Sequence, residues 1–589
     1  MMNFQFSSPP RRLFRRQVFP ALLLLVALSS AAVAERRERL IENWRPLHYD
    51  VTLAFNSELG ELTRAETKLD ALVLRDNIAV IDLDFGALMI DSLSVGGRPA
   101  RYERQGERLN VFLARPARRG ERLRLSVVYH GRPVDGLILT NDKDGHPSVT
   151  GDNWPNRVHH WIPSLDHPSA KATVTFRITT PANTVAVANG RHEGGGSGLS
   201  ATEWLYTQGT PIPPYCMIVF IGRHDVINAP TNNLRNAVPL SYYVPKSDRD
   251  MAVRGFSAAR PSLVFFSRTV APFPYEKLAH IVGSTRFGGM ENSGAIVYAR
   301  TLFDPRENAP LSPRFGVRRG LVELIAHETA HQWFGDAVTP ATWSDLWLSE
   351  GFATYYAGLF VEHAEGRDAF RDYMRRKGEE YLKYEATRRA PIYDRETEDL
   401  NELLNANNYQ KGAWVLHMLR AELGDAAFSR GVRAYYRAHL HGNATTEDLR
   451  ASLERASGRR LREFFARWVY ASGHPRYEAA WTWNEGASNR GGVLTLTLKQ
   501  TQEGDAAPFP NSVPVEIVTG AATRRITLKP TGRETVTRLN LNARPSDVRF
   551  DPGETILKEL RVQPAPPVSP TRNPQLKNAQ RRGARAILR

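Results

Sequence analysis

The segment LIAHETAHQWFGD, residues 324–336, holds two histidines four residues apart, His327 and His331, with Glu328 directly after the first. On an α-helix, positions i and i+4 are separated by about 400° of rotation, so both imidazoles project from one face and can bind one metal ion. Glu328 projects about 100° away from His327, where it flanks the metal and can take a proton from a metal-bound water. An ordinary amphipathic helix also fits this pattern, because the pattern fixes only three residues.

A catalytic zinc ion has three protein ligands and one open coordination position, so two histidines are an incomplete site. Glu350 stands nineteen residues after His331, in the segment LWLSEGFATYYAG. The turn-like stretch VTPATWSD between the two segments allows the chain to reverse and to lay the Glu350 carboxylate beside the histidines. We therefore predict one Zn²⁺ held by His327, His331 and Glu350, with Glu328 as the general base.

Two other features that could do chemistry are interpreted as structural. His159 and His160 are adjacent, so on a strand they face opposite ways and cannot share a metal; we expect ordinary surface or packing residues. Cys216 is the only cysteine, in the apolar run YCMIVFIG, so an internal disulfide is impossible. We expect Cys216 to be a buried, inert thiol in a strand.

Length and patterning predict several domains around this site. With 589 residues, of which 42% are hydrophobic and 24% charged, the chain can form two to four cores. Short alternating runs predict an N-terminal β domain over residues 35–228, and helical periodicity predicts a mostly helical catalytic domain over residues 229–474. Alternation returns over residues 475–560 and predicts a small β-sandwich.

The two ends of the chain carry much of the net charge of +16. Residues 1–34 contain RRLFRR, the apolar run VFPALLLLVAL and the tripeptide AVA, which is the pattern of a secretory signal peptide with its cleavage site. Residues 561–589 hold seven Lys or Arg and no acid, which predicts a disordered basic tail. The remaining charge, about +5, is of mixed sign without a basic stripe, so no nucleic-acid partner is expected.

Four segments in order resemble one peptidase family. HETAHQWFGD and LWLSEGFATYY resemble the zinc signature of the family that includes membrane alanyl aminopeptidase, bacterial aminopeptidase N and leukotriene hydrolase. RFGGMENSGAIVY, residues 286–298, is similar to its G-x-M-E-N exopeptidase motif, and NNYQKGAWVLHMLR, residues 407–420, is similar to the segment with its catalytic tyrosine. The resemblance implies a multidomain α and β fold: an N-terminal β-sheet saddle, a thermolysin-like catalytic domain and a C-terminal β-sandwich. The C-terminal helical domain of many relatives has no counterpart in this pattern, and we expect an open substrate chamber.

The resemblance also implies roles for the matching residues. Glu291 would bind the positively charged amino terminus of a peptide, because an enzyme that removes only the first residue needs an anion at a fixed distance from the scissile carbonyl. Tyr409 would donate a hydrogen bond to the oxyanion that forms when water attacks that carbonyl. The neighbours of Glu291 expected to contact the substrate are Gly288, Gly289, Met290 and Asn292.

The sequence departs from the family at two positions near the site. Many relatives place a glutamate or glutamine of the N-terminal domain against the substrate amino group, and this chain has Trp154 there, in GDNWPNRVHHWIPSLDHP. Asp152 is close by in the sequence and is a possible replacement. The usual NEGFA reads SEGFA, with Ser349 before the zinc glutamate.

The combined prediction is an exported, periplasmic or secreted zinc aminopeptidase that removes N-terminal residues from peptides. It has no transmembrane segment after signal cleavage, and its basic tail can contact anionic surfaces. Two alternatives stay open: a zinc endopeptidase, which does not need Glu291, and a catalytically inactive peptide-binding protein on the same scaffold. An epoxide hydrolase is disfavoured, because DLNELLNANNY before Tyr409 does not resemble the tyrosine-containing segment of the family member with that activity.

Overall fold

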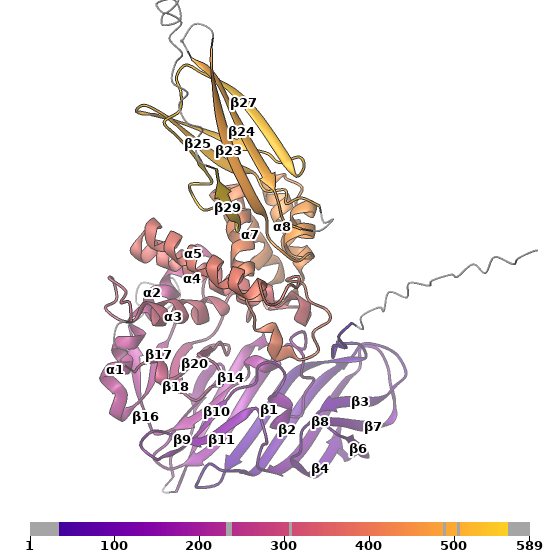
Figure 1. Cartoon of the computed structure of the whole chain (residues 1–589). Helices are drawn as coiled ribbons and strands as arrows, with labels where there is room; N and C mark the ends of the chain where they lie inside the picture. Colours follow the sequence, from indigo (N-terminus) through magenta and orange to yellow (C-terminus); the bar gives the residue numbers. More distant parts are fainter. Residues whose placement is uncertain are drawn as a thin grey trace, which may run out of the picture.

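The computed structural model describes residues 35–198, 200–230, 238–304, 309–486, 491–503 and 507–563. Within them an N-terminal β-rich part is followed by a mostly helical part and then by further strands. Figure 1 shows the N-terminal sheets on one side of the helices and the C-terminal strands extending away on the other side. The predicted signal peptide and all but the first three residues of the predicted basic tail lie outside the described residues.

The N-terminal part consists of strands and two short 3₁₀ turns. Its elements are β1 (Trp44–Phe55), β2 (Leu62–Val73), β3 (Ile78–Asp84), β4 (Met89–Val95), β5 (Arg98–Pro99), β6 (Tyr102–Gln105), β7 (Arg108–Ala117), β8 (Arg122–Gly131), β9 (Leu137–Asn141), β10 (Pro147–Gly151), η1 (Val158–His160), β11 (Ala172–Pro181), β12 (Val185–Ala188), β13 (Arg191–Gly194), β14 (Ala201–Ile212), η2 (Pro214–Cys216) and β15 (Val219–Gly222). The large sheet has the order β13-β14-β11-β1-β2-β8-β4-β5, beside smaller sheets β12-β15-β10-β9 and β3-β7-β6. Alternate residues of β1, such as Tyr49, Val51 and Leu53, are buried, as the period-2 pattern predicts.

The catalytic part begins with a small sheet and not with helices. Its strands are β16 (His224–Ala229), β17 (Leu240–Pro245), β18 (Leu278–Gly283), β19 (Gly289–Met290) and β20 (Ala295–Ala299), in the order β16-β17-β18-β20-β19. β16 pairs with β17 along its whole length, so residues 224–228, which we assigned to the N-terminal domain, belong to this sheet. Alternation alone could not reveal this, since strands of adjacent sheets share the same period.

The helices of this part surround the predicted metal ligands. They are α1 (Arg249–Gly255), α2 (Ala259–Thr269), α3 (Arg319–His331), α4 (Trp347–Glu365), α5 (Arg367–Glu385), α6 (Gly412–Leu423), α7 (Asp425–His439), α8 (Thr446–Ser457) and α9 (Arg462–Trp468), with the π-turn η8 (Asn407–Lys411), the short turns η3 (Lys246–Asp248), η4 (Phe256–Ala258), η5 (Arg300–Leu302), η6 (Trp343–Asp345) and η7 (Leu400–Leu403), and the strand pair β21 (Thr339–Pro340) and β22 (Asn443–Ala444). α4 is apolar on most of its surface, because α3, α5, α6 and η8 pack around it. No helix in the described part of the chain is both long and apolar enough to cross a membrane.

The C-terminal part contains seven strands among its described residues. They are β23 (Arg476–Glu485), β24 (Gly492–Gln500), β25 (Val513–Thr519), β26 (Ala522–Leu528), β27 (Glu534–Leu541), β28 (Asp547–Phe550) and β29 (Glu559–Val562). They form two sheets, β27-β24-β23-β29 and β26-β25-β28. β29 pairs with β23 as far as Val562, so ordered chain continues two residues beyond the expected start of the tail.

A buried lysine joins the N-terminal part to the catalytic part. Lys171, directly before β11, donates hydrogen bonds from Nζ to the carbonyl oxygens of Asp336 at 2.8 Å, Ala337 at 3.0 Å and Gly442 at 3.1 Å. Burial lowers the pKa of Lys171 to about 7, and the nearby Asp336 carboxylate opposes this shift. Lys171 thereby holds the chain directly after α3, the helix that carries two of the predicted metal ligands.

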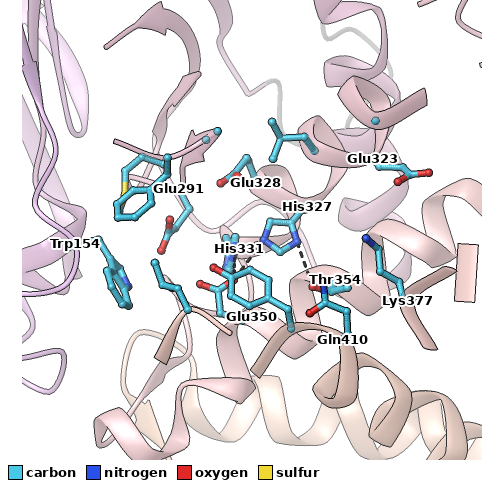
Figure 2. A pocket seen from close by; sticks show the side chains of 18 of the residues that line it. Trp154, Glu291, Glu323, His327, Glu328, His331, Glu350, Thr354, Lys377 and Gln410 are labelled. Atoms are coloured by element: carbon cyan, nitrogen blue, oxygen red, sulfur yellow. Dashed lines mark hydrogen bonds and ion pairs between the residues drawn. The ribbon is translucent and has the colours of Figure 1, made fainter. Parts of the chain in front are cut away.

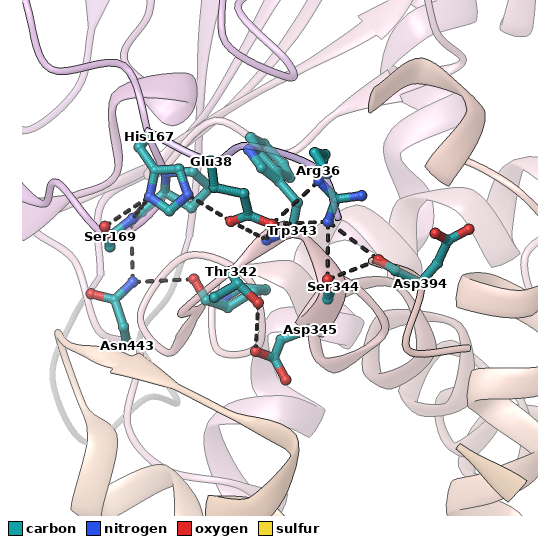
Figure 3. A network of polar contacts seen from close by, with 12 residues as sticks. Arg36, Glu38, His167, Ser169, Thr342, Trp343, Ser344, Asp345, Asp394 and Asn443 are labelled. Atoms are coloured by element: carbon teal, nitrogen blue, oxygen red, sulfur yellow. Dashed lines mark hydrogen bonds and ion pairs between the residues drawn. The ribbon is translucent and has the colours of Figure 1, made fainter. Parts of the chain in front are cut away.

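Residues that precede β1 hold the chain before α4 (Figure 3). The Glu38 carboxylate accepts hydrogen bonds from the backbone N–H of Trp343 at 3.1 and 3.2 Å and lies 3.0 Å from His167 Nε2. Arg36 donates from Nη2 to Ser344 Oγ at 3.0 Å. Since α4 starts three residues after Ser344, this network fixes the start of the helix that carries the third predicted ligand.

Candidate metal centre and substrate cavity

Two neighbouring helices bring the predicted metal ligands together (Figure 2). His327 and His331 lie on α3, and Glu350 lies in the first turn of α4. The two Nε2 atoms are 3.0 Å apart, and each lies 3.3 Å from Glu350 Oε2. Ligand atoms around a tetrahedral zinc ion are separated by about 3.3 Å when the bonds are about 2.0–2.1 Å long. The spacing of the three atoms therefore fits such an ion.

The buried Glu350 carboxylate between the two histidines also favours the binding of a cation. Glu350 Oε2 is buried and receives no regular hydrogen bond from the described residues. Burial raises the pKa of Glu350, but His331 and His327 outweigh it and bring the value to about 2. Burial lowers the pKa of His331, but Glu350 outweighs it and raises the value to about 10, whereas burial and His331 lower that of His327 to about 4. Protein atoms alone therefore keep a proton on His331, at the place where a metal ion would bind.

The other ring nitrogen of His331 is held by neighbouring atoms. His331 Nδ1 donates to the Phe334 carbonyl at 3.1 Å and lies 3.1 Å from Ser349 Oγ. This leaves Nε2 facing the cluster, as in metal sites where a second contact orients the ligand. Gly335 allows this packing: its φ is +123°, and a Cβ there would lie 2.3 Å from Ser349 Oγ. Ser349, one of the departures from the family pattern, thus helps to orient one of the predicted metal ligands.

Glu328 is buried on α3 and lines the cavity beside the three ligands. Its carboxylate packs against Gly289, where a Cβ would lie 2.3 Å from Oε1, so a larger residue at that position would displace the carboxylate. Burial, with further contributions from Glu291 and Glu350, raises the pKa of Glu328 well above its usual range, although His331 opposes the shift. A carboxyl group with a raised pKa can accept and return a proton near neutral pH.

Glu291 follows β19 and lies on the cavity wall close to the metal cluster. Carboxylate oxygens of Glu291 and Glu328 and a ring nitrogen of His331 all lie within 4.8 Å of one another. Burial raises the pKa of Glu291 to about 7, and His331 opposes this shift. A buried carboxylate without a salt bridge among the described residues is suited to receive a cationic group from a ligand.

Gln332, which the sequence reasoning missed, supports the loop of Glu291. Its side chain is fully buried; Nε2 donates to the Glu291 carbonyl at 2.9 Å, and Oε1 accepts from Gly294 N at 2.7 Å. Nε2 also donates to Asp336 Oδ2 at 2.9 Å, and Cys216 Sγ donates to the other oxygen of Asp336 at 3.3 Å. Cys216 is buried as expected, but in the turn η2 and not in a strand. Gln332 directly follows His331 in the sequence, and this proximity to a predicted ligand is the signal that could have identified it.

Tyr409 lies on the π-turn η8 and lines the same cavity. Its ring is stacked on His327, with centroids 5.8 Å apart and planes at 10°. Burial and the carboxylates of Glu350 and Glu291 raise the pKa of the phenol well above its usual range. The hydroxyl therefore stays protonated at neutral pH and can donate a hydrogen bond.

These groups line a cavity of about 540 Å³ (Figure 2). Of the neighbours of Glu291 that we expected to contact the substrate, Gly288, Gly289 and Met290 line this cavity, whereas the fully buried Asn292 does not. Trp154 forms part of the wall near Glu291, with its ring edge-on to Phe287 at 5.9 Å and to Trp343 at 5.7 Å.

Asp152, the possible replacement for the missing acid or amide, is not brought to this wall. It is buried, and its Oδ2 accepts a hydrogen bond from the backbone N–H of Arg286 at 3.0 Å. Burial raises its pKa to about 6, and Arg286 opposes this shift. An aromatic wall therefore stands where the family pattern places a polar group.

The other end of the cavity carries residues that sequence reasoning did not identify. Figure 2 shows Glu323, Thr354, Lys377 and Gln410 beyond His327, away from Trp154 and Glu291. Helical spacing could have indicated two of them, because Glu323 precedes His327 by four residues and Thr354 follows Glu350 by four. Lys377, on α5, has no such local signal; its ammonium pairs with Glu380 at 2.9 Å.

Two histidines on one helix, a carboxylate on the next and a free buried glutamate beside them form the arrangement of a zinc-metallopeptidase centre. Comparison with known families agrees: the Peptidase M1 N-terminal domain matches residues 45–215, and the Peptidase family M1 domain matches residues 257–468. Together the two matches cover more than half of the chain. The chain belongs to peptidase family M1, and the resemblance drawn from its motifs is confirmed.

Individual relatives are similar at low identity. The probable aminopeptidase 1 of Saccharolobus solfataricus is 26% identical over 441 residues, which are 72% of this chain and 53% of the relative. Human glutamyl aminopeptidase is 28% identical over 338 residues, 56% of this chain and 34% of that protein. The crystal structure of an M1 zinc metallopeptidase from Deinococcus radiodurans matches with a TM-score of 0.60 and 25% identity, over 73% of this chain and 94% of that one. The chain spans about half the length of the curated aminopeptidase of S. solfataricus.

Proposed function

We propose that the protein is a zinc-dependent aminopeptidase that hydrolyses the first peptide bond of peptides with a free amino terminus. The observation that carries the proposal is the position of Glu291, whose carboxylate lies within 4.8 Å of ligand atoms of Glu328 and His331. A metal cluster alone fits any zinc peptidase. A second buried carboxylate at a fixed place beside it favours a substrate whose cationic end lies one residue from the bond that is cut.

His327, His331 and Glu350 would hold the zinc ion, which when bound polarises the scissile carbonyl and lowers the pKa of water. The charged amino terminus would bind Glu291, whose loop Gln332 keeps in place. This contact would orient the first residue so that its carbonyl lies next to the metal ligands.

Glu328 would transfer the protons, and Tyr409 would stabilise the charge that develops on the substrate. Glu328, kept in the cavity by its contact with Gly289, would take a proton from the attacking water and return it to the leaving amine. Tyr409 would donate its phenolic proton as a hydrogen bond to the oxygen on which negative charge develops. Trp154 and Phe287 would cover the first residue with apolar surface and exclude water from that end of the cavity.

The proposal extends to the architecture and location of the protein. The mixed N-terminal sheet supports a saddle-like domain, the small sheet followed by α3 and α4 supports a thermolysin-like catalytic domain, and the two C-terminal sheets support a β-sandwich. Residues 1–34 support export to the periplasm or secretion, and the basic residues of 561–589 support contact with anionic surfaces.

The test is a panel of amino-acid amides and dipeptides, each with a free and an N-acetylated amino terminus, assayed with and without a zinc chelator. We expect cleavage of the free forms only, loss of activity with the chelator and recovery on addition of zinc. Equal cleavage of acetylated and free forms would identify an endopeptidase, and Glu291→Ala would then leave activity unchanged. No hydrolysis by the zinc-loaded protein, with binding of peptides retained, would identify an inactive binding protein.

A further inference from the structure

A second group of two histidines and one glutamate lies in the N-terminal part, outside the substrate cavity. It consists of His159 and His160 on η1 and Glu107 in the turn between β6 and β7. The expectation that His159 and His160 face opposite ways is wrong, because they lie on a 3₁₀ turn and not on a strand. Their ring centroids are 4.2 Å apart, with planes at 37°, so both rings reach the same side.

The donor atoms of this group have the spacing of a metal site. His159 Nε2 lies 3.3 Å from Glu107 Oε2, and His160 Nδ1 lies 3.8 Å from Glu107 Oε1. All three ligand atoms lie within 4.8 Å of one another. Ligand atoms of a tetrahedral zinc site are about 3.3 Å apart, so the longer separations in this group, which reach at most 4.8 Å, must shorten when an ion binds. Glu107 is the most exposed of the three, which leaves its side chain free to move toward the histidines.

The two histidines are prepared for coordination in different ways. His159 donates from Nδ1 to Asp166 Oδ2 at 2.8 Å, which directs Nε2 toward Glu107 in the carboxylate–histidine arrangement common around metal ions. His160 Nδ1 is a buried nitrogen without a hydrogen-bond partner among the described residues. Gly86 makes room for it, because a Cβ at that position would lie 2.7 Å from His160 Nδ1. A buried ring nitrogen without a partner is costly unless a ligand uses it.

The surroundings supply both charge and space for a cation. A cavity of about 360 Å³ opens beside His159 and is lined by the carboxylates of Asp84, Glu107 and Asp166 and by two arginines. Both arginines are already engaged: Arg39 lies 2.7 Å from Asp82, and Arg108 lies 2.8 Å from Asp84. Water can enter this cavity and provide the remaining ligand of a four-coordinate ion.

We propose that Glu107, His159 and His160 bind a second divalent cation of the zinc class, separate from the proposed catalytic ion. Two imidazoles and one carboxylate are ligands that suit zinc and disfavour calcium or magnesium. The bound ion would join the β6–β7 turn to η1. Its role is structural, because the lining residues of its cavity are not among those of the substrate cavity.

The test counts metal ions on the folded chain. Protein that contains its catalytic zinc is freed of loose metal, equilibrated with a small excess of ZnCl₂ and desalted, and bound zinc is measured by inductively coupled plasma mass spectrometry. We expect two zinc ions per wild-type chain and one per chain of His160→Ala or Glu107→Gln. His146→Ala is the matched control: His146 belongs to a different, partly exposed group with Asp142 and Asp144, and we expect this variant to keep both ions.

Thermal unfolding gives a second, independent measurement. Added zinc should raise the Tm of the wild type and of His146→Ala, and this increase should be absent in His160→Ala and Glu107→Gln. Circular dichroism before heating shows whether each variant is folded. One zinc ion per wild-type chain, or a second ion that persists in both His160→Ala and Glu107→Gln, would overturn the proposal. Glu350→Gln separates the two sites, because it should lose the catalytic ion and keep this one.

Discussion

The described part of the chain contains two groups of two histidines and one glutamate, and they are built from opposite local geometries. In the catalytic part, His327 and His331 are one helical turn apart and Glu350 comes from the next helix. In the N-terminal part, the histidines are neighbours in sequence on a 3₁₀ turn, and the glutamate comes from a turn between strands. The ligand atoms lie within 4.8 Å of one another in both groups, so their proximity does not by itself indicate catalysis.

The difference lies in the carboxylates around each group. Beside the catalytic ligands, Glu328 and Glu291 are buried and face a substrate-sized cavity without a salt bridge among the described residues. Beside His159, Asp166 is tied to the imidazole at 2.8 Å and to the backbone N–H of the same residue at 3.1 Å. A carboxylate that is engaged in hydrogen bonds to a histidine can orient that histidine as a ligand, but it cannot transfer a proton between water and substrate. The free carboxylates therefore distinguish a reactive centre from a structural one.

The largest expected effect comes from removing the free carboxylate of the catalytic group. Glu328→Gln should lower kcat/KM by about 10²- to 10⁴-fold, the usual contribution of a general base. The bound catalytic zinc should stay at one per chain, because Glu328 is not a ligand. Steady-state kinetics together with metal analysis check this, and a Glu328→Gln enzyme as active as wild type would contradict the proposed role.

The carboxylate that we propose binds the substrate amino terminus should have the next largest effect. Glu291→Gln keeps the shape but removes the charge that would meet the substrate amino terminus. A hydrogen bond to a charged group contributes about 1.5–3 kcal/mol, so kcat/KM for free amino-acid amides should fall by about 10- to 100-fold. The comparison with N-acetylated amides is the control: the ratio of the two rates should shrink, and an unchanged ratio would assign amino-terminus recognition to another group.

Substitutions of the side chain that contacts Nδ1 of one histidine in each group should lower zinc affinity by different amounts. Asp166→Asn weakens the contact that orients His159, and loss of such a contact typically lowers metal affinity about 10- to 100-fold. Ser349→Ala should lower catalytic zinc affinity less, because the Phe334 carbonyl still accepts from His331 Nδ1 at 3.1 Å. Competition with a chromophoric zinc chelator measures both affinities. A larger loss in Ser349→Ala would show that the serine hydroxyl, and not the carbonyl, orients His331.

The smallest expected effect on kcat/KM tests whether the two histidine groups act independently. His160→Ala should leave kcat/KM for amino-acid amides within about twofold of wild type, since substitutions away from a reaction centre rarely change transition-state binding. The assay is run at saturating zinc so that the catalytic ion is present in both proteins. A fall of tenfold or more would mean that η1 and the substrate cavity are coupled.

The catalytic group was predictable because its information is local and periodic. Two histidines four residues apart on a helix face one way whatever surrounds them, and one chain reversal brings Glu350 to them. The other group was missed because the prediction assumed a strand at His159 and His160, whereas a 3₁₀ turn places neighbouring rings on one side. Glu107 lies more than fifty residues away in sequence, and no periodicity connects it to η1.

The fold was predictable in its classes of element and less so in its boundaries. The switch from period 2 to helical spacing located the main parts, but β16 belongs to the sheet of the catalytic part because of its pairing with β17. Gln332 escaped notice because its function depends on a loop that approaches α3 from about forty residues earlier in the chain. Tertiary contacts of this kind leave no pattern in the local sequence.

The contacts of Lys171 affect how the N-terminal and catalytic parts unfold. Its ammonium is buried, and the three carbonyl oxygens that it binds all belong to the catalytic part. Separating the N-terminal part from the catalytic part would expose these carbonyls and release the chain after α3. Asp336 in this chain segment accepts a hydrogen bond from Gln332, which supports the loop of Glu291. Unfolding by heat or denaturant should therefore proceed as one cooperative step for both parts, with enzymatic activity lost in the same transition as the N-terminal sheet.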